Sequence, residues 1–310
     1  MAKSRPGIVL CDLISRYEFS VTPRSLFDAE GVPLECRDKS EFMKGLEGLI
    51  EGGCHAQGKS TIAIDCMGLV NQLRIDKSTE TMSDLANQFV AKVEAEIKDF
   101  NTIILSFDNY GDNSPVALLK QQTWVNRYKD SAIQYNITPR TEIKKIKLKD
   151  LLSHKMNKEL LCRLLAARVI QHLDRDKKQY AVANDQIIYS NIPGWSSFTH
   201  SQPESDTLII CLVRELCNLV GADRPVRILS PDTDVLMLAV YLASTGCAAE
   251  IEFELLNSKA RRIIPVSSLA AQLGPKNSIG LLAAYILTGC DQIGKFNTVS
   301  KERAFKVFMT

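Results

Sequence analysis

The stretch that most constrains the fold of this chain is Val226–Tyr241. It begins with a short apolar run, Val226–Leu229, of the kind that forms a buried parallel strand. A Ser-Pro pair ends this run, and an apolar segment of helical length begins at Val235. Asp232 and Asp234 therefore stand where a strand gives way to a helix, and ligands of open α/β sheets bind at that edge.

The two carboxylates have two interpretations. Aspartate is a favoured N-cap residue, so one of them is expected to cap the helix. A cap needs only one carboxylate, and two carboxylates ~4 Å apart repel by roughly 4 kcal/mol at an effective dielectric constant near 20. A bound divalent cation would reverse the sign of that interaction. The pair by itself leaves the helix cap and the metal site both open.

Two earlier runs repeat the pattern. Thr61–Met67 and Asn101–Phe107 are apolar and rich in β-branched residues, so they predict strands that deliver Asp65 and Asp108 near their ends. The segment Glu80–Phe100 between them has apolar residues at helical spacing. A strand, a helix and a strand in succession favour a right-handed parallel crossover, which places both acids at one edge of the sheet. A single Asp at a strand end is more often a turn residue.

The remaining segments supply further acids. Glu204 and Asp206 lie in or before the first turn of a helix that starts near Pro203, where acidic residues also suit the helix dipole. Asp291 lies in a Gly-bearing turn. Other helices are predicted at Leu13–Phe19, Glu41–Glu51, Val116–Lys129, Lys149–Leu173, Ser267–Leu273, Ser278–Leu287 and Ser300–Phe308, and strands at Tyr180–Tyr189 and, as an outer strand, Glu250–Leu256.

The composition narrows the class of protein. With 310 residues, 45% of them hydrophobic and 24% charged, the chain is typical of globular proteins. No apolar run reaches membrane-spanning length and the N-terminus has no signal-peptide core, so we expect no membrane partner. The nine cysteines are scattered without a Cys-x-x-Cys motif. This pattern favours reduced thiols and an intracellular location, nuclear or cytoplasmic.

Positive charge is concentrated in one segment. Residues 120–168 contain twelve Lys and Arg against four Asp and Glu, a net charge of +8, so the rest of the chain carries −6. A basic block on an acidic body is a candidate footprint for a polyanion, and the alternative is a solvated helix face. The candidate nucleic-acid contacts are Lys120, Arg127, Lys129, Arg140, Lys144 and Lys145.

The acids at strand ends and helix starts form one set. Its members are Asp65, Asp108, Glu204, Asp206, Asp232, Asp234 and Asp291. So many carboxylates at one sheet edge cannot all stay ionised without a counter-charge. Hard oxygen ligands suit Mg²⁺ or Mn²⁺ rather than zinc, and two such ions ~4 Å apart form the site used for phosphodiester cleavage.

In order and spacing, these residues resemble the flap-endonuclease-like branch of the PIN-domain nucleases. The matching pieces are Ile64-Asp65, Phe107-Asp108, Glu204-Ser-Asp206, Asp232-Thr-Asp234 and Leu287-Thr-Gly-Cys-Asp291, with a basic helical insertion between the second and the third. The resemblance covers roughly residues 61–308. Three stretches also resemble a group of animal PIN-like proteins: Ser25–Asp28, Pro203–Thr207 and Leu287–Asp291.

The resemblance implies a three-layer α/β/α sandwich with a central, mainly parallel sheet, and a nuclease that cleaves DNA or RNA with two Mg²⁺ or Mn²⁺ ions. Residues 1–60 are expected to form an N-terminal extension packed on a nuclease domain over 61–310, which has a basic helical insertion at about 115–175 and C-terminal helices over 267–310. The resemblance implies that Asp65, Asp108 and Glu204 bind the first ion and that Asp232, Asp234 and Asp291 bind the second. It implies that Asp206 lies between the two ions. It also implies that Lys120 and Arg127 contact the scissile phosphate.

Three features depart from the family's pattern. Sixty residues precede the first strand, Gln292 replaces the usual aromatic residue after the last Asp, and Phe296–Lys301 has no Gly-x-Gly hairpin. These departures weaken the expectation of duplex binding and flap specificity, and they leave the predicted metal site intact.

Two alternatives remain open. The first is a nuclease that has lost turnover and acts as a nucleic-acid-binding or scaffold protein. The second is another Mg²⁺-dependent α/β enzyme, a phosphatase or a glycosyltransferase. An aspartyl phosphatase would need Asp-x-Asp on the first strand, where Asp65 is instead followed by Cys66 and Met67.

Overall fold

The computed structural model describes residues 25–31, 34, 38–50, 61–109, 133–195, 200, 202, 204–220, 224–256, 262–290 and 294–310. The chain divides into two compact units: a sheet unit, Gly52–Ala270, and a helical unit made of Met1–Glu51 with Ala271–Thr310. The sequence-based boundary at residue 60 stays a prediction. None of the described helices is long and apolar enough to cross a membrane.

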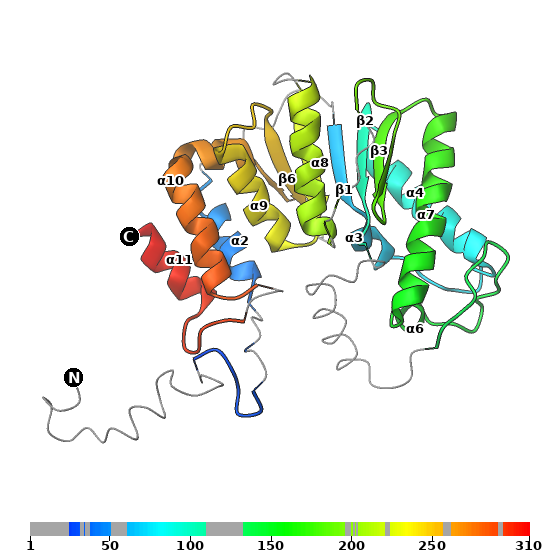
Figure 1. Ribbon diagram of the computed structural model, residues 1–310, viewed down its shortest axis with the longest axis horizontal. Helices are drawn as coiled ribbons and strands as arrows, with labels where there is room; N and C mark the ends of the chain where they lie inside the picture. The colour runs from blue at the N-terminus through cyan, green and yellow to red at the C-terminus, as the bar shows by residue number, and fades with distance from the viewer. Residues whose placement is uncertain are drawn as a thin grey trace, which may run out of the picture. The chain divides into compact units, whose positions relative to one another are not determined.

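The sheet unit contains one mixed sheet (Figure 1). Its strands are β1 (Thr61–Asp65), β2 (Thr102–Ser106), β3 (Gln179–Asn184), β4 (Ile187–Ser190), β5 (Val226–Ser230), β6 (Ile251–Leu255) and β7 (Ile263–Ile264). Their order is β4-β3-β2-β1-β5-β6-β7. The strands from β3 to β6 in that order are parallel, and β4 and β7 pair antiparallel at the two sides. The prediction of a central, mainly parallel sheet is confirmed.

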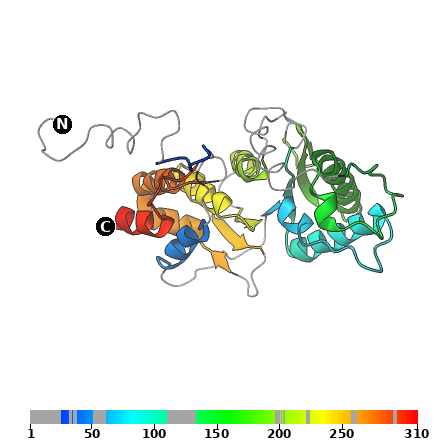
Figure 2. The same cartoon turned by 90° about the horizontal axis from the view of Figure 1, so that it is seen from below.

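Helices cover both faces of the sheet. They are α3 (Cys66–Val70), α4 (Met82–Ile97), α6 (Leu148–Leu151), α7 (Lys155–Arg175), α8 (Ser205–Val220) and α9 (Thr233–Ser244). Along the sheet, the chain moves one way from β1 through β2 to β3. It then returns past β1 to β5 and β6, which lie on the other side. Right-handed crossovers therefore put α4 and α7 on one face and α8 and α9 on the opposite face. α4 packs beside α7 and α8 beside α9, which gives the predicted three-layer sandwich (Figures 1 and 2).

The central strands form because they are continuous apolar runs. Every residue of β1 and β2 is buried, as a sheet covered on both faces requires. Helix α4 sends Leu85, Phe89 and Val93 into the same core at the spacing of one helical face. It begins with a capping box in which the Thr81 hydroxyl accepts the Asp84 N–H and the Asp84 carboxylate accepts the Thr81 N–H.

Two predicted elements differ from the structure. The single helix predicted at Lys149–Leu173 is two helices, α6 and α7, because His154 breaks the helix and caps α7 by accepting the Met156 N–H. The single strand region predicted at Tyr180–Tyr189 is a hairpin of β3 and β4. Asp185 adopts a left-handed backbone conformation (φ 55°) at its turn, which Asp tolerates better than most residues.

In the helical unit, a buried lysine ties the C-terminal helix to its neighbour. Lys301 is 1% exposed, and its Nζ donates to the carbonyl of Tyr285 at 2.8 Å and to Oγ1 of Thr288 at 3.2 Å. As the sequence predicts, Ser300 caps the last helix and the preceding helix breaks at Gly274. The described helices of this unit are α2 (Ser40–Glu47), α10 (Val266–Leu287, which begins at the end of the sheet unit) and α11 (Lys301–Met309).

The strand predicted as an outer strand, Glu250–Leu256, is internal. β6 pairs with β5 on one side and with the short β7 on the other. Its alternating glutamates, Glu252 and Glu254, are only 3% and 5% exposed. Arg227 on β5 donates to Glu252 at 2.8 Å and to Glu254 at 3.3 Å, and it lies over the Phe100 ring. One guanidinium thus pairs with two carboxylates within the sheet.

Arg227→Ala should lower the free energy of unfolding by roughly 3–5 kcal/mol, because two buried carboxylates lose the guanidinium as an ion-pair partner. Urea unfolding followed by circular dichroism measures the change. Lys306→Ala, which removes an exposed ion pair with Glu302, is the matched control and should change stability little. A loss in Arg227→Ala no larger than in the control would contradict the role assigned to Arg227.

Candidate functional site

Six of the seven predicted acids lie at one edge of the sheet unit, and Asp291 lies outside the described residues. Because β1 is parallel to both β2 and β5, the C-terminal ends of the three strands meet at this edge. The chain leaves β1 and β5 toward opposite faces, so the edge includes the topological switch point of the sheet. Open α/β sheets bind ligands at that point.

Asp65 ends β1 and begins α3. Its carboxylate accepts the Met67 N–H at 3.1 Å, which caps α3, and it accepts the Ser230 hydroxyl at 3.0 Å. The residue is 4% exposed. Burial raises the pKa of the neighbouring Cys66 thiol, and the charge of Asp65 adds to that effect. Asp65 therefore combines a turn role with a position in a desolvated pocket.

Asp108 follows β2 and contacts the start of α8. Its Oδ1 accepts the Ser205 N–H at 2.9 Å, while the Ser205 hydroxyl donates to the Ser106 carbonyl at 3.2 Å. These two bonds hold the N-terminus of α8 against the end of β2. Glu204 directly precedes Ser205 and is 5% exposed, and Asp206 lies in the first turn of the helix. Ser205 thus positions an acid on each side of itself.

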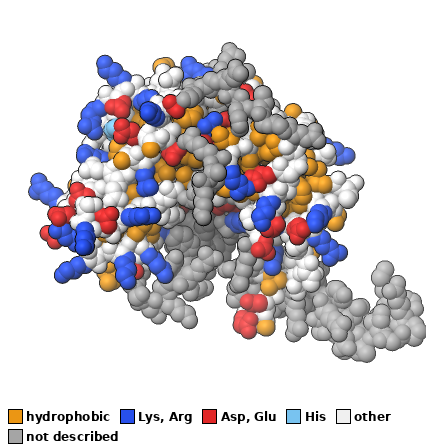
Figure 3. All heavy atoms as spheres, turned by 180° about the vertical axis from the view of Figure 1, so that it is seen from behind, with side chains coloured by type: hydrophobic (Ala, Val, Ile, Leu, Met, Phe, Trp, Pro, Cys, Tyr) orange, Lys and Arg blue, Asp and Glu red, His pale blue; other side chains and the backbone are white. Residues whose placement is uncertain are grey.

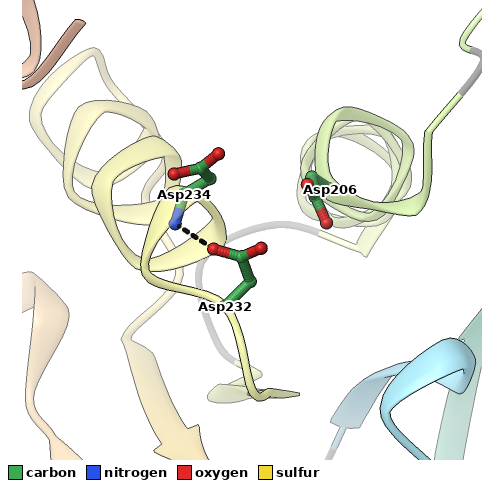
Figure 4. A group of neighbouring side chains, drawn as sticks. All are labelled: Asp206, Asp232 and Asp234. Atoms are coloured by element: carbon green, nitrogen blue, oxygen red, sulfur yellow. Dashed lines mark hydrogen bonds between the residues drawn. The ribbon is translucent and has the colours of Figure 1, made fainter. Parts of the chain in front are cut away.

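Asp206, Asp232 and Asp234 form a cluster of half-buried carboxylates (Figure 4). One oxygen of each lies within 4.8 Å of the others. Asp232 is the N-cap of α9 and accepts the Asp234 N–H at 2.9 Å, so the helix-cap interpretation is correct for Asp232. Asp234, in the first turn of α9, and Asp206, on α8, are not needed for that cap. The positive ends of two helix dipoles favour carboxylates here.

Ser230, the last residue of β5, connects the acids of the two groups. Its hydroxyl donates to Asp65 Oδ2 at 3.0 Å and accepts the Asp232 N–H at 3.1 Å. The Ser205 side chain, which donates to the Ser106 carbonyl, also lowers the pKa of Asp65. Two serines therefore join four segments of the chain that are far apart in sequence.

Burial makes Asp65 difficult to ionise. It raises the pKa of Asp65 from 3.8 to about 7, and the charge of Asp108 contributes further to the increase. The hydrogen bonds from Ser230 and Met67 act in the opposite direction without cancelling it. A divalent cation beside these carboxylates would favour their ionised forms.

The donor set fits a hard divalent cation. Oxygen ligands of Mg²⁺ lie about 2.1 Å from the ion, so two ligands of one ion are at most about 4.2 Å apart. The oxygens of Asp206, Asp232 and Asp234 lie within 4.8 Å of each other, close to that limit. Asn109, next to Asp108, adds a 4% exposed amide with no hydrogen-bond partner within the described part of the chain. Its amide oxygen is a neutral ligand of the type that Mg²⁺ and Mn²⁺ accept.

The basic block is only partly described. Three predicted contacts lie outside the described residues: Lys120, Arg127 and Lys129. Arg140, Lys144 and Lys145 lie among the turns before α6, and Lys144 pairs with Glu80 at 2.8 Å. Both partners are exposed, which agrees with the solvated-face alternative for Lys144. Figure 3 shows Lys and Arg interspersed with Asp and Glu on the visible face. The nucleic-acid contacts stay predictions.

Sequence patterns did not single out Ser205 and Ser230, which bond acids of the site, or Asn109, which directly follows one. Each directly adjoins or lies within two residues of a predicted acid. The sequence predicts only that Ser230 ends a strand. A polar side chain at the end of a buried apolar run is, however, expected to form a hydrogen bond. Which acid that hydroxyl contacts depends on strand order, and local sequence does not carry that information.

No protein-family model matches the chain, and no curated protein matches it. Among solved structures, the chain is similar to the crystal structure of a bacteriophage T5 flap endonuclease, a pseudo-enzyme–product complex with DNA and metal ions. The identity is 12% and the TM-score 0.44, over 81% of this chain and 75% of that chain. At this distance, the function rests on the residues of the chain itself. The resemblance to animal PIN-like proteins stays a prediction.

Asp65 should make the stability of the metal-free protein depend on pH. Its folded pKa of about 7 exceeds its ordinary value of 3.8, so its contribution to stability is complete below pH ~4 and is lost as the pH rises toward 7. Asp65→Asn keeps the cap and removes this loss. The free energy of unfolding of Asp65→Asn should exceed that of the wild type by roughly 2–4 kcal/mol at pH 8 and by less at pH 5. Melting curves in EDTA at both pH values measure the difference.

The matched control is Glu94→Gln, which removes an exposed carboxylate of α4. It should follow the wild type at both pH values. A wild type that is more stable than Asp65→Asn at pH 8 would show that the buried carboxylate is stabilised rather than strained.

Proposed function

We propose that this chain is a divalent-metal-dependent nuclease that hydrolyses phosphodiester bonds of DNA or RNA. The observation that carries the proposal is the meeting of acids from four segments at the switch point of the sheet, three of them with oxygens within 4.8 Å. A structural role requires caps for α3 and α9, which Asp65 and Asp232 supply. It does not require Asp206 and Asp234 beside a cap, whereas a cation site does.

The proposed ligands fall into two groups. Asp65, Asp108 and Glu204 would hold one Mg²⁺ or Mn²⁺ ion, Asp232 and Asp234 would hold the other, and Asp206 would lie between them. When bound, such ions lower the pKa of a water molecule and neutralise the leaving oxygen. The chain's own contribution is to keep the ligands in place, because Ser205 and Ser230 fix the carboxylates on either side of the sheet's switch point.

The charge of the chain supports a polymeric substrate. A nucleic-acid backbone presents a row of phosphates, and each Lys or Arg contact releases condensed counterions, which strengthens binding. The net charge of +8 over residues 120–168 is suited to that task, and it exceeds what a small phosphate ester needs. The acids would then act on a backbone held by the basic block.

A second candidate is a protein that binds nucleic acid without turnover. The raised pKa of Asp65 favours it, because a carboxyl that is half protonated near neutral pH is a weaker metal ligand than an ionised one. The two candidates share the fold and the acids and differ in metal occupancy and cleavage. A measurement of both on one preparation separates them.

Asp234→Asn and Asp206→Asn should abolish cleavage and leave the fold intact, because an amide keeps the shape of the side chain and removes the charge that holds the ion. Mn²⁺ should stabilise the wild type by about 2.7 kcal/mol at a hundredfold excess over its dissociation constant. The double variant should lose most of that gain. Melting curves with and without Mn²⁺ and cleavage of labelled single-stranded, duplex, flap and RNA substrates are the measurements.

Glu94→Gln is again the control, since it removes one charge outside the cluster and should retain both the Mn²⁺ shift and cleavage. A metal shift without cleavage of any substrate would support the second candidate. If the wild type shows no Mn²⁺ shift and cleaves no substrate, the acids are only caps and turn residues, and the proposal is refuted.

Replacing Lys120 and Arg127 by Ala should weaken binding of a single-stranded oligonucleotide. Each lost phosphate contact should reduce the slope of log K against log salt by about 0.7–0.9, because fewer counterions are released. Fluorescence anisotropy over a salt series measures both quantities. Lys306→Ala is the matched control, because Lys306 lies outside the basic block and pairs with Glu302 on the surface. An unchanged slope and affinity would return Lys120 and Arg127 to the solvated-face alternative.

A further inference from the structure

Asn157 joins the start of α7 to the stretch of chain that precedes it. The residue is 0% exposed. Its Oδ1 accepts the Tyr135 N–H at 2.8 Å, and its Nδ2 donates to the Ile133 carbonyl at 2.8 Å. A carboxamide suits this bridge because it carries an acceptor and a donor side by side. One buried side chain therefore fixes two backbone groups that are 22 and 24 residues away in sequence.

The bridge lies at the edge of the sheet where the predicted acids meet, which we call the acid edge. The chain leaves β2 at this edge, and α7 leads into the parallel strand β3, so α7 begins here. Further along α7, the Cys162 sulfur lies 3.8 Å from that of Met67, whose N–H donates to Asp65. At 1.5 Å per residue, Asn157 is about 7.5 Å along the helix axis from that contact. The bridge is therefore a neighbour of the candidate site.

The stretch that follows the bridge is held by the start of α4. The Met82 N–H donates to the Thr141 carbonyl at 3.0 Å, and the Ile143 N–H donates to the Glu80 carbonyl at 2.9 Å. Ile143 is fully buried in the core. α4 also begins at the acid edge, because it leads from β1 into the parallel strand β2. The stretch 133–143 is therefore tied to α4 and to α7 where both helices begin.

The position of Ile133 limits how far two predicted nucleic-acid contacts can be from the acids. Lys129 is four residues before Ile133, and Arg127 is six residues before it. A fully extended chain spans at most about 3.6 Å per residue, so the Cα atoms of Lys129 and Arg127 lie within about 14 Å and 22 Å of that of Ile133. These limits hold for any backbone conformation. The segment 110–132 also leaves the described chain at the acid edge, directly after Asn109, which follows Asp108.

We propose, on the basis of the proposed function, that Asn157 is a positioning residue for the nucleic-acid substrate. Through its bonds to Ile133 and Tyr135 it keeps Arg127 and Lys129 near the acid edge, so that one stretch of phosphate backbone contacts the cations and the acids together. Ile133 is 61% exposed and has little packing of its own to hold it. Without the bridge, substrate binding must order additional chain, and this ordering lowers the affinity.

Asn191 provides a matched control at the opposite edge of the sheet. Its Oδ1 accepts the Tyr180 N–H at 2.8 Å, and its Nδ2 donates to the Lys178 carbonyl at 2.9 Å. Tyr180 and Lys178 lie at the start of β3, away from the acids. Asn191→Ala therefore removes the same pair of bonds as Asn157→Ala, and it leaves the acid edge unchanged. A bridge with a structural role alone would give the two variants the same phenotype.

The test measures three properties of the wild type and both variants: binding of a labelled single-stranded DNA over a salt series, the Mn²⁺-dependent melting shift, and cleavage at saturating substrate. Asn157→Ala should bind about fivefold more weakly or worse, with a slope of log K against log salt shallower by at least about 0.7, the value of one phosphate contact. Its kcat should fall about tenfold or more, which is about 1.4 kcal/mol. It should keep the Mn²⁺ shift, because other contacts hold the acids. Asn191→Ala should match the wild type in all three.

Asn157→Asp tests one bond of the bridge. A carboxylate accepts the Tyr135 N–H but cannot donate to the Ile133 carbonyl, so this variant should lose affinity and slope in the same direction as Asn157→Ala. It decides the question if the alanine variant fails to fold.

Wild-type affinity and slope in the Asn157 variants would overturn the inference. An equal loss in Asn191→Ala, or loss of the Mn²⁺ shift in Asn157→Ala, would also overturn it, because either result would indicate general disruption. A wild type that binds the DNA and cleaves no substrate would refute the proposed turnover, and the binding comparison would still decide the role of Asn157.

Discussion

The parallel pairing of β1 with β2 on one side and β5 on the other is the constraint on which the rest of the structure depends. It places three strand ends at one edge. Because the crossovers on the two sides of β1 lie on opposite faces, the helices there diverge and leave room at the edge. Every described acid of the candidate site ends a strand, follows one or begins a helix. The position of each therefore follows from topology, and a different strand order would scatter them.

Buried carboxylates have two different kinds of partner in this structure. Glu252 and Glu254 both form ion pairs with Arg227 on the neighbouring strand, so their burial is consistent with stability. At the sheet edge, the contacts of Asp65 described above are hydroxyl and amide donors, and they do not offset burial and the charge of Asp108. A cation close to Asp65 would offset both effects and favour its ionised form.

Much of the fold could be predicted because its signals are local. Apolar runs the length of a strand predict β1, β2 and β5, and the spacing of Leu85, Phe89 and Val93 predicts α4. The errors arose where a short polar stretch decides between continuation and a break. His154 separates α6 from α7, and the turn at Asp185 converts one predicted strand into a hairpin. Side chains of that kind suit several local conformations, and packing of the flanking elements selects among them.

The sequence by itself determined which acids stand at element boundaries, since an Asp after an apolar run is visible without any structure. It also predicted that Asp232 or Asp234 caps a helix, and the tertiary structure chose Asp232. Only the tertiary structure decided that Asp206 faces these two and that Ser230 bonds Asp65. The physical reason is that boundaries depend on neighbours in the chain, whereas these contacts depend on strand order, which sets the partners of residues far apart in sequence.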